Sequence, residues 1–391
     1  MPPLIFRKGL DLKHAVADVL AASYHSDLVK RLKETEYRFE SGRLEVRLAR
    51  EFGFCYGVDR AVDYAYQARR RFPDRPVVLT GEIIHNPHVN DQLRAQGIRF
   101  LTDPGESLDG LTPNDVVILP AFGVTTTLLE TLTDKGCTLV DTTCGSVLNV
   151  WKNVRRYAED GFTSVIHGKH WHEETQATAS QAVKAGGQYL VVLDEAEAAL
   201  VCDFIRDGGD PVAFLARFQA AVSAGFDPTR HLARIGCANQ TTMLSTESLQ
   251  IGDMFRRATE ARYGAAALAE HFRAFDTICS ATQDRQDAVL ALLEERLPDL
   301  MLVVGGYNSS NTYNLARICA ERVPTYHIAD AEALLSGDEV RHMALGKKTE
   351  ALAREWLPRE GRISIGLTSG ASTPDNIVGA VIARLDALAN A

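Results

Sequence analysis

One pattern recurs along this chain of 391 residues and limits the folds open to it. A short β-branched run is followed by a polar or Gly-rich turn and then by an amphipathic helix, which is the sequence form of a parallel α/β sheet. Clear examples of such runs are residues 116–120, 301–304 and 363–367, and a helix is expected to begin near Asp375 after the third. The chain is therefore expected to be an α/β protein.

The composition excludes several classes of protein. Hydrophobic residues make up 46% of the chain and charged residues 24%, which suits a large soluble core. Because 42 Lys and Arg face 51 Asp and Glu, the net charge of −9 offers no general field for nucleic acid or anionic lipid. No apolar stretch approaches the ~18 residues of a membrane span, and no secretory segment is recognisable at the N-terminus. We expect a cytoplasmic protein with neither nucleic-acid nor membrane partners, in which any phosphate is held locally.

The first 47 residues are highly charged, and their apolar residues fall at roughly helical spacing from Leu10 to Leu20. They are expected to form an N-terminal helical extension on the surface.

Three of the seven cysteines are predicted to occupy the same kind of structural position, a turn directly before a helix. They are Cys55, Cys144 and Cys279. The odd number of cysteines and the lack of any C-x-x-C pair argue against a disulfide framework and a zinc ribbon. Three converging thiolates would suit a four-iron cluster with one iron open to substrate. The alternative is three buried thiols in unrelated cores, and Cys237 is a further thiol that could compete as a ligand.

The segment 165–175 begins as a strand and then packs three histidines and two carboxylates into a short stretch. A carboxylic acid there could donate a proton, while imidazoles could bind an anion or orient the acid. The alternatives are a solvated loop and a zinc site, although the spacing lacks the i, i+4 histidines of helical zinc proteases.

Three further turns, 240–242, 308–311 and 370–372, are rich in hydroxyls and amides where a helix is expected to begin. Helix N-termini bind phosphate through their free N–H groups. Ordinary N-capping is the alternative for each turn taken alone. Two histidines, His85 and His88, follow another predicted strand.

Taken together, these segments resemble the 4-hydroxy-3-methylbut-2-enyl diphosphate reductase (LytB) family, over about residues 48 to 380. The N-terminal segment is similar to the longer plant and cyanobacterial branch. The motifs that carry the resemblance are 53–58, 84–86, 141–144, 172–174, 240–242, the Cys279 segment, 308–311 and 370–372.

The resemblance implies a fold of three similar α/β domains with mainly parallel sheets, arranged around a central iron-sulfur cluster. We expect residues 1–47 to form the extension, followed by domains at 48–144, 145–278 and 279–391. The resemblance implies that Cys55, Cys144 and Cys279 are the ligands of a [4Fe-4S] cluster, with Cys144 at the boundary between the first two domains.

The resemblance also implies a reductive dehydroxylation that yields isopentenyl and dimethylallyl diphosphate in the methylerythritol phosphate pathway. Glu174 would deliver the proton and Thr241 would lie near the hydroxyl end. The substrate diphosphate would be bound by His85, His172, Ser309, Ser310, Asn311 and Ser372.

An electron-donating partner, ferredoxin or flavodoxin, is expected, because no G-x-G-x-x-G motif opens a βαβ unit to hold a nicotinamide. Three rival functions stay open: a non-redox iron-sulfur hydro-lyase, an iron-sulfur sensor and a zinc hydrolase.

Two positions depart from the family pattern. Phe122 stands where many bacterial members have His, so one diphosphate donor is missing. Gly145 and Ser146 follow Cys144 where Pro and a larger residue are usual, so a looser turn is expected beside this candidate ligand.

Overall fold

The computed structural model describes residues 4–275, 277–347 and 349–391. The described chain forms two compact units. The two-sheet unit consists of Leu4–Ala121, Thr138–Thr142 and Ser280–Ala391, and the one-sheet unit consists mainly of Phe122–Cys137 and Thr143–Cys279.

The first sheet of the two-sheet unit has five strands, all parallel, in the order β1-β7-β6-β4-β5. Small residues of its longest helix, Ala61 and Ala65, belong to the same buried hydrophobic cluster as Leu79 and Ile118 of the sheet, so helix and strands share one core. The elements are β1 (Ile5–Phe6), β4 (Val77–Leu79), β5 (Arg99–Phe100), β6 (Val116–Leu119) and β7 (Thr138–Asp141), with helices α3 (Tyr56–Arg71) and α4 (Pro87–Ala95).

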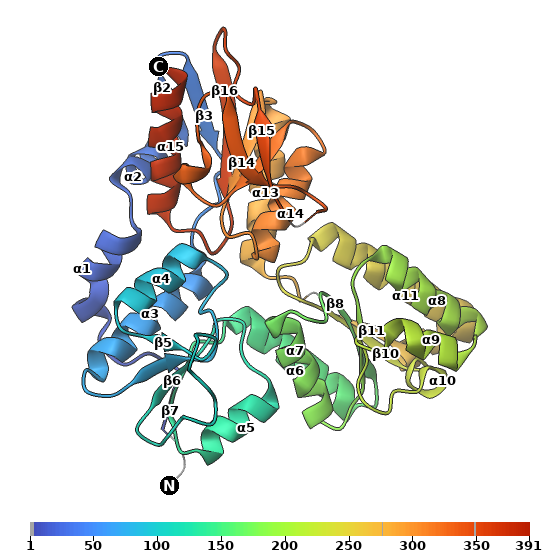
Figure 1. Cartoon of the computed structure of the whole chain (residues 1–391). Coiled ribbons are helices and arrows are strands. Elements are labelled where there is room, and N and C mark those ends of the chain that lie inside the picture. The colour runs from blue at the N-terminus through green and yellow to red at the C-terminus, as the bar shows by residue number, and fades with distance from the viewer. Residues whose placement is uncertain (1–3, 276, 348) are drawn as a thin grey trace. The chain divides into compact units, whose positions relative to one another are not determined.

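The second sheet of this unit has seven strands in the order β15-β14-β13-β12-β16-β3-β2. Its four central strands are parallel and its margins are antiparallel. In Figure 1 the blue strands β2 and β3 lie beside the red-orange β16, so the two ends of the chain share one sheet. The strands are β2 (Arg38–Ser41), β3 (Leu44–Leu48), β12 (Leu300–Val304), β13 (Thr325–Ile328), β14 (Glu339–Met343), β15 (Glu350–Arg354) and β16 (Ile363–Ser369). The helices are α13 (Ser280–Glu295), α14 (Ser310–Ala320), η2 (Ala331–Ala333) and α15 (Asp375–Ala389).

The one-sheet unit contains four parallel strands in the order β11-β10-β8-β9. A Cβ on Gly236 would lie 2.6 Å from the ring of Tyr157, so only glycine lets this strand and the tyrosine approach so closely. The strands are β8 (Thr163–His167), β9 (Tyr189–Val192), β10 (Ile235–Asn239) and β11 (Phe272–Ala274). The helices are α5 (Thr126–Asp134), α6 (Gly145–Glu159), α7 (Glu173–Lys184), α8 (Glu195–Asp207), α9 (Pro211–Phe218), α10 (Pro228–His231), α11 (Ser245–Tyr263), η1 (Ala265–Ala267) and α12 (Leu268–His271).

The N-terminal segment is tied into the two-sheet unit. It forms α1 (Lys13–Tyr24) and α2 (Asp27–Glu34). The side-chain oxygen of Gln67 accepts hydrogen bonds from the backbone N–H groups of Leu10 and Leu12, at 3.0 and 3.2 Å. Helix α2 ends at Glu34. Residues 38–41 and 44–48 then form β2 and β3, which pair as an antiparallel ladder, and the side chains of β2 alternate between exposed and half-buried.

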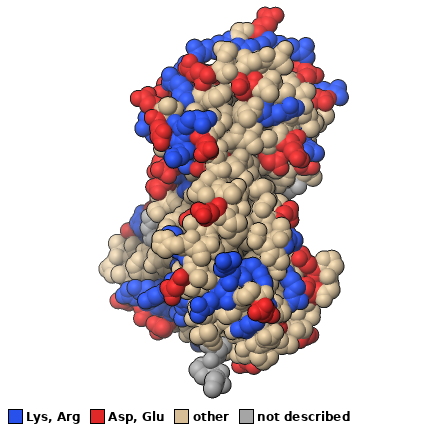
Figure 2. Space-filling model, turned by 90° about the vertical axis from the view of Figure 1, so that its left-hand side faces the viewer, with Lys and Arg blue, Asp and Glu red and all other residues tan. Residues whose placement is uncertain are grey.

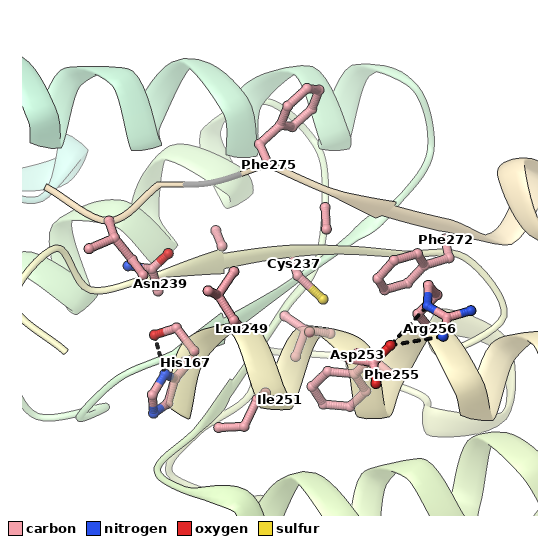
Figure 3. A pocket seen from close by; sticks show the side chains of 16 residues that line it. His167, Cys237, Asn239, Leu249, Ile251, Asp253, Phe255, Arg256, Phe272 and Phe275 are labelled. Atoms are coloured by element: carbon pink, nitrogen blue, oxygen red, sulfur yellow. Dashed lines mark hydrogen bonds and ion pairs between the residues drawn. The ribbon is translucent and has the colours of Figure 1, made fainter. Parts of the chain in front are cut away.

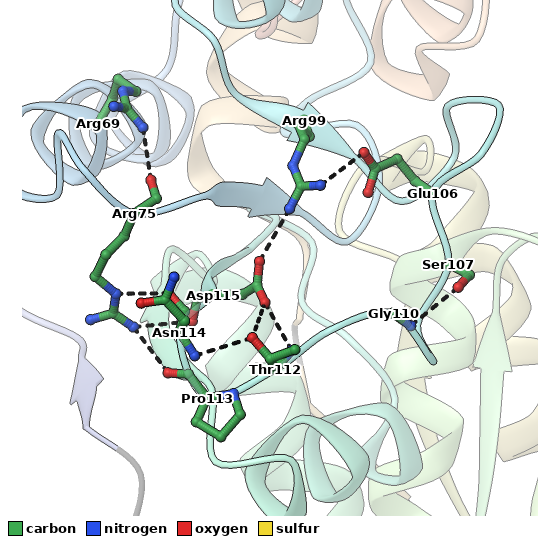
Figure 4. A network of polar contacts seen from close by, with 10 residues as sticks. All are labelled: Arg69, Arg75, Arg99, Glu106, Ser107, Gly110, Thr112, Pro113, Asn114 and Asp115. Carbon is green, nitrogen blue, oxygen red and sulfur yellow. Dashed lines mark hydrogen bonds and ion pairs between the residues drawn. The ribbon is translucent and has the colours of Figure 1, made fainter.

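The loop between β5 and β6 is held by a polar network within the two-sheet unit (Figure 4). Arg99 donates to Glu106 and to Asp115, each at 3.1 Å. Asp115 also accepts from the backbone N–H and the hydroxyl of Thr112, each at 2.8 Å. The buried Asp115 carboxylate thus has several donors, as a buried charge requires.

These sheets confirm the α/β class and the mainly parallel strand arrangement; the arrangement around a cluster and the division into 1–47, 48–144, 145–278 and 279–391 stay predictions. No helix in the described part of the chain is long and apolar enough to cross a membrane. On the face shown in Figure 2, basic and acidic side chains are interspersed.

Candidate active site

The three candidate cluster cysteines each stand directly before a helix. Cys55 is the N-cap of α3, Cys144 is the N-cap of α6, and Cys279 immediately precedes α13. All three thiols are half-buried and none is in a disulfide. The free N–H groups and the dipole at a helix N-terminus suit a bound anionic group. The structure confirms the predicted position of the three cysteines directly before helices, while their role as ligands stays a prediction.

Two of these thiol segments meet within the one-sheet unit. The hydroxyl of Ser146, in the first turn of α6, donates a hydrogen bond to the sulfur of Cys279 at 3.3 Å. Ser146 is two residues from Cys144, so the departure from the family pattern at this turn supplies a contact between the segments. A Cβ on Gly145 would meet nothing within 4 Å, so the space at this position does not require glycine.

Three of the four remaining cysteines are poor ligands. Burial raises the pKa of Cys202 and of Cys319 to about 12, which keeps both thiols protonated at neutral pH. Burial also raises the pKa of Cys237, the thiol that could compete as a ligand. Figure 3 shows the Cys237 sulfur pointing from β10 into a mostly apolar pocket of about 260 Å³ within the one-sheet unit. None of the predicted site residues lines that pocket.

The predicted acid and its neighbour are brought together in the one-sheet unit. Glu174 lies in the first turn of α7, after β8, and Thr241 follows β10, the adjacent parallel strand. The two carboxylate oxygens of Glu174 accept hydrogen bonds from the Thr241 N–H at 2.6 Å and from the Thr241 hydroxyl at 3.0 Å. Both residues are buried, so the pair is rigidly held in a low-dielectric environment.

His172 is the N-cap of α7, and its bonding defines its tautomer. Its Nδ1 accepts a hydrogen bond from the N–H of Glu174 at 3.1 Å. The Glu173 carboxylate lies 3.9 Å from the same nitrogen, but an ion pair there would require a proton on Nδ1. The hydrogen bond from the Glu174 N–H is the shorter of the two contacts, so we assign the tautomer of His172 from it: Nδ1 is unprotonated and Nε2 carries the hydrogen. The ring of Phe122 packs edge-on against the His172 ring, with centroids 6.2 Å apart.

The other candidate substrate residues gather in the two-sheet unit. The parallel strands β3, β16 and β12 are neighbours, and the turns after them carry Cys55, Ser372 and Asn311 respectively. Because the carboxyl ends of parallel strands meet at one edge of a sheet, the turns are adjacent. Two hydrogen bonds at Ala371 connect these turns. The N–H of Cys55 donates to the Ala371 carbonyl at 3.1 Å, and the N–H of Ala371 donates to the side-chain oxygen of Asn311 at 2.9 Å.

Asn311 is the clearest sign of a ligand in this group. The residue is 3% exposed, and its side-chain oxygen is already engaged by Ala371. Its amide nitrogen is buried and donates to no acceptor in the described part of the chain. Buried donors are nearly always paired, so this nitrogen is placed for an acceptor that binds from outside the protein. A phosphate oxygen has the right chemistry.

The two neighbouring serines are placed differently. Ser309 caps α14, and its hydroxyl oxygen accepts from Thr312 N–H at 3.3 Å and from the Thr312 hydroxyl at 3.0 Å. Ser310 is the buried first residue of that helix. Capping and phosphate binding are therefore compatible at this turn, because the Ser309 hydroxyl still has its own proton to donate.

His85 is oriented by a carboxylate that the sequence analysis did not single out. Its Nδ1 lies 2.8 Å from an oxygen of Glu82, and the side-chain amide of Asn308 donates to the same oxygen at 2.7 Å. A carboxylate only accepts, so His85 Nδ1 carries a proton. The Ser372 hydroxyl donates to the His85 carbonyl at 3.3 Å, which joins this histidine to the 370–372 turn. Glu82 precedes His85 by three residues, but only the fold brings Asn308 to them.

The predicted site residues therefore fall into two sets. The one-sheet unit holds Cys144, Cys279, His172, Glu174 and Thr241, and the two-sheet unit holds Cys55, His85, Ser309, Ser310, Asn311 and Ser372. Hydrogen bonds connect residues within each set.

Comparison with known proteins identifies the family. The family model described as LytB protein matches residues 46–386. The chain belongs to the LytB family. This confirms the resemblance expected from the motifs. Among LytB relatives, a 4-hydroxy-3-methylbut-2-enyl diphosphate reductase of Gloeobacter violaceus is 50% identical over 388 residues, covering 97% of this chain and 91% of the relative. A protein of the same name from Thermosynechococcus vestitus is 48% identical, covering 98% of this chain and 94% of the relative.

Solved structures agree with the LytB assignment. One, described as (E)-4-hydroxy-3-methyl-but-2-enyl diphosphate reductase, the terminal enzyme of the non-mevalonate pathway, superposes with a TM-score of 0.52 at 26% identity. The superposition covers 88% of this chain and 99% of that one. The E-1-hydroxy-2-methyl-but-2-enyl-4-diphosphate reductase from Plasmodium falciparum has a TM-score of 0.64 at 21% identity, covers 87% of each chain, and supports the fold alone.

Proposed function

We propose that this chain is a 4-hydroxy-3-methylbut-2-enyl diphosphate reductase, acting at the last step of the non-mevalonate route to isoprenoids. The observation that carries this proposal is the near full-length similarity, at about half identity, to relatives that bear this name. The reaction removes the allylic hydroxyl: two electrons and two protons enter, water leaves, and isopentenyl or dimethylallyl diphosphate remains.

The cysteines fit an iron-sulfur cluster. Cys55, Cys144 and Cys279 are half-buried thiols outside any disulfide that stand directly before helices, whereas burial keeps Cys202, Cys237 and Cys319 protonated. The first three would hold a [4Fe-4S] cluster. When bound, the cluster would supply the electrons and one iron without a cysteine ligand as a Lewis acid for the hydroxyl.

Glu174 and Thr241 would deliver the proton to the hydroxyl end of the substrate. The Thr241 hydroxyl both donates and accepts, and it lies 3.0 Å from the Glu174 carboxylate. A proton that reaches Glu174 can therefore pass through Thr241 to the departing hydroxyl, which leaves as water. The second bond, from Thr241 N–H, keeps the carboxylate in the orientation that this transfer needs.

The diphosphate end is bound by neutral donors and histidines. The unused amide hydrogen atoms of Asn311 and the hydroxyls of Ser309 and Ser310 offer hydrogen bonds to phosphate oxygens, and the Ser372 hydroxyl would do so after turning from the His85 carbonyl. The Glu82 carboxylate accepts from Nδ1 of His85 and orients its ring, and an imidazolium at this position would donate to phosphate through Nε2. His172 donates through Nε2 in its neutral form, and Phe122 packs against its ring in place of a second donor.

An external one-electron donor, ferredoxin or flavodoxin, completes the proposal. We also propose that an N-terminal extension at 1–47 is followed by three α/β domains at 48–144, 145–278 and 279–391, arranged around the cluster. The proposed location of the protein is the cytoplasm.

The test is anaerobic purification, iron and sulfide analysis, and assay with the hydroxylated diphosphate and a chemical reductant. We expect bound iron and sulfide and reductant-dependent formation of both isoprenoid diphosphates. Turnover without a reductant would support a hydro-lyase instead, and an intact cluster without turnover would support a sensor. Zinc in place of iron would refute the cluster assignment.

A further inference from the structure

We propose that Arg285 is a positioning residue for the cluster. The buried positive charge of Arg285 offsets the negative charge of the cysteine-ligated iron and thereby raises the reduction potential of the cluster. This inference rests on the cluster of the proposed function. Arg285 lies outside the residues assigned above to metal, proton or diphosphate.

Arg285 ties together the backbone of two ligand segments. It lies on α13 and is 3% exposed. One of its terminal nitrogens donates to the carbonyl of Gly53 at 2.7 Å, and the other donates to the carbonyl of Ala281 at 2.7 Å. Gly53 is two residues before Cys55, and Ala281 is two residues after Cys279. The guanidinium is therefore fixed beside the turn that carries Cys55.

The charge of Arg285 has no counter-ion in the described part of the chain. No described carboxylate forms an ion pair with it, and its Nε is buried without an acceptor there. Asp375 comes close to Gly53, since a Cβ on that glycine would lie 2.7 Å from its oxygen, but Asp375 is paired with Lys33 at 2.8 Å. A buried cation without an anion is strongly unfavourable, so the site calls for negative charge.

The helix increases this demand. Arg285 is the sixth residue of α13, less than two turns from the helix start, whose free N–H groups carry partial positive charge. The first turn of α13 contains no acidic residue that could offset that end. Thiolates bound to iron beside Cys55 would supply the missing charge. A fixed cation near a cluster favours its more reduced, more negative state, and charges and hydrogen bonds around a cluster set its potential.

The experiment compares wild type, Arg285→Lys and Arg285→Met by iron and sulfide content and by anaerobic redox titration followed by electron paramagnetic resonance. Arg234→Met is the matched control, because Arg234 also donates to two backbone carbonyls but precedes β10, at the end of the strand opposite Thr241. We expect Arg285→Met to shift the reduction equilibrium of the cluster roughly tenfold toward the oxidised form, about 59 mV for one electron. Arg285→Lys and the control should stay near the wild-type potential.

A wild-type potential in fully loaded Arg285→Met would overturn the inference. If that variant loads no cluster, the thermal stability of the cluster-free chains decides. Cluster-free Arg285→Met should be at least as stable as the cluster-free wild type, because it has lost an unpaired buried charge; a large loss of stability would show a merely structural residue and refute the proposal. Absence of iron and sulfide in the wild type would instead refute the proposed function itself.

Discussion

Replacing Glu174 by Gln removes the proposed proton carrier while preserving its shape. In the native site, both carboxylate oxygens accept from Thr241, at 2.6 and 3.0 Å. In Glu174→Gln, the remaining oxygen can keep the bond from the Thr241 N–H. The new amide can donate to the Thr241 hydroxyl, whose proton turns away. The geometry of the site should therefore survive, and only its capacity to carry a proton is lost.

The size of the effect follows from these contacts. Two charge-assisted bonds become neutral ones, which should reduce the free energy of unfolding by about 1–2 kcal/mol. Loss of a general acid typically costs about 10²–10⁴ in rate, roughly 3–5 kcal/mol of barrier. We therefore expect kcat to fall by about that factor while the iron and sulfide content is unchanged.

The assay is steady-state turnover under strict anaerobiosis with a chemical reductant, with product ratios measured alongside. Glu173→Gln is the control, because Glu173 lies in the same helical turn with its side chain 57% exposed. That control should keep wild-type kcat. If Glu174→Gln, loaded with cluster, turned over within about twofold of wild type, the role assigned to this carboxylate would be wrong.

Three further predictions concern binding and stability. Asn311→Asp places a carboxylate where an amide donor faces the ligand, so the KM for the diphosphate substrate should rise by about 100-fold or more, checked by anaerobic kinetics. Glu82→Gln should weaken the binding of inorganic pyrophosphate about tenfold, measured by calorimetry, with little change in melting temperature; unchanged binding would remove Glu82 from the site. Burial lowers the pKa of His327 to about 4, so the unfolded chain takes up this proton first as the pH falls below ~6.5. Stability from this residue is complete above pH ~6.5 and should decline by about 2 kcal/mol at pH 5, and urea unfolding of His327→Gln should lack that part of the decline.

Much of the fold could be predicted from hydrophobic periodicity. The runs at 116–120, 301–304 and 363–367 correspond to β6, β12 and β16, because short, mostly apolar runs rich in Val and Ile suit strands covered on both faces. The helix expected near Asp375 begins at that residue. Residues 38–48 were harder to assign, because charged side chains such as Glu45 and Arg47 are buried in β3 and mask its strand pattern.

The residues of the candidate site could be predicted from the sequence by their type, but most of their hydrogen-bond partners could not. Glu174 and Thr241 could be singled out, but their two hydrogen bonds depend on β8 and β10 being neighbours, which periodicity does not specify. Glu82 and Arg285 were missed for a related reason. Their importance comes from what they touch, the His85 ring and the Gly53 carbonyl, and a local pattern contains no signal for such contacts.

The two residues of β1 have a consequence for the behaviour of the chain in concentrated solution. They pair with Leu139 and Val140 of β7, so the outer edge of that strand is covered at its two central residues. Without this cover, β7 would be an open sheet edge, the kind of surface onto which strands of other molecules add. Since β7 runs directly toward the turn of Cys144, such association would begin beside a candidate metal ligand. The two residues of β1 thus cover the central part of the β7 edge, which leads to the turn of Cys144.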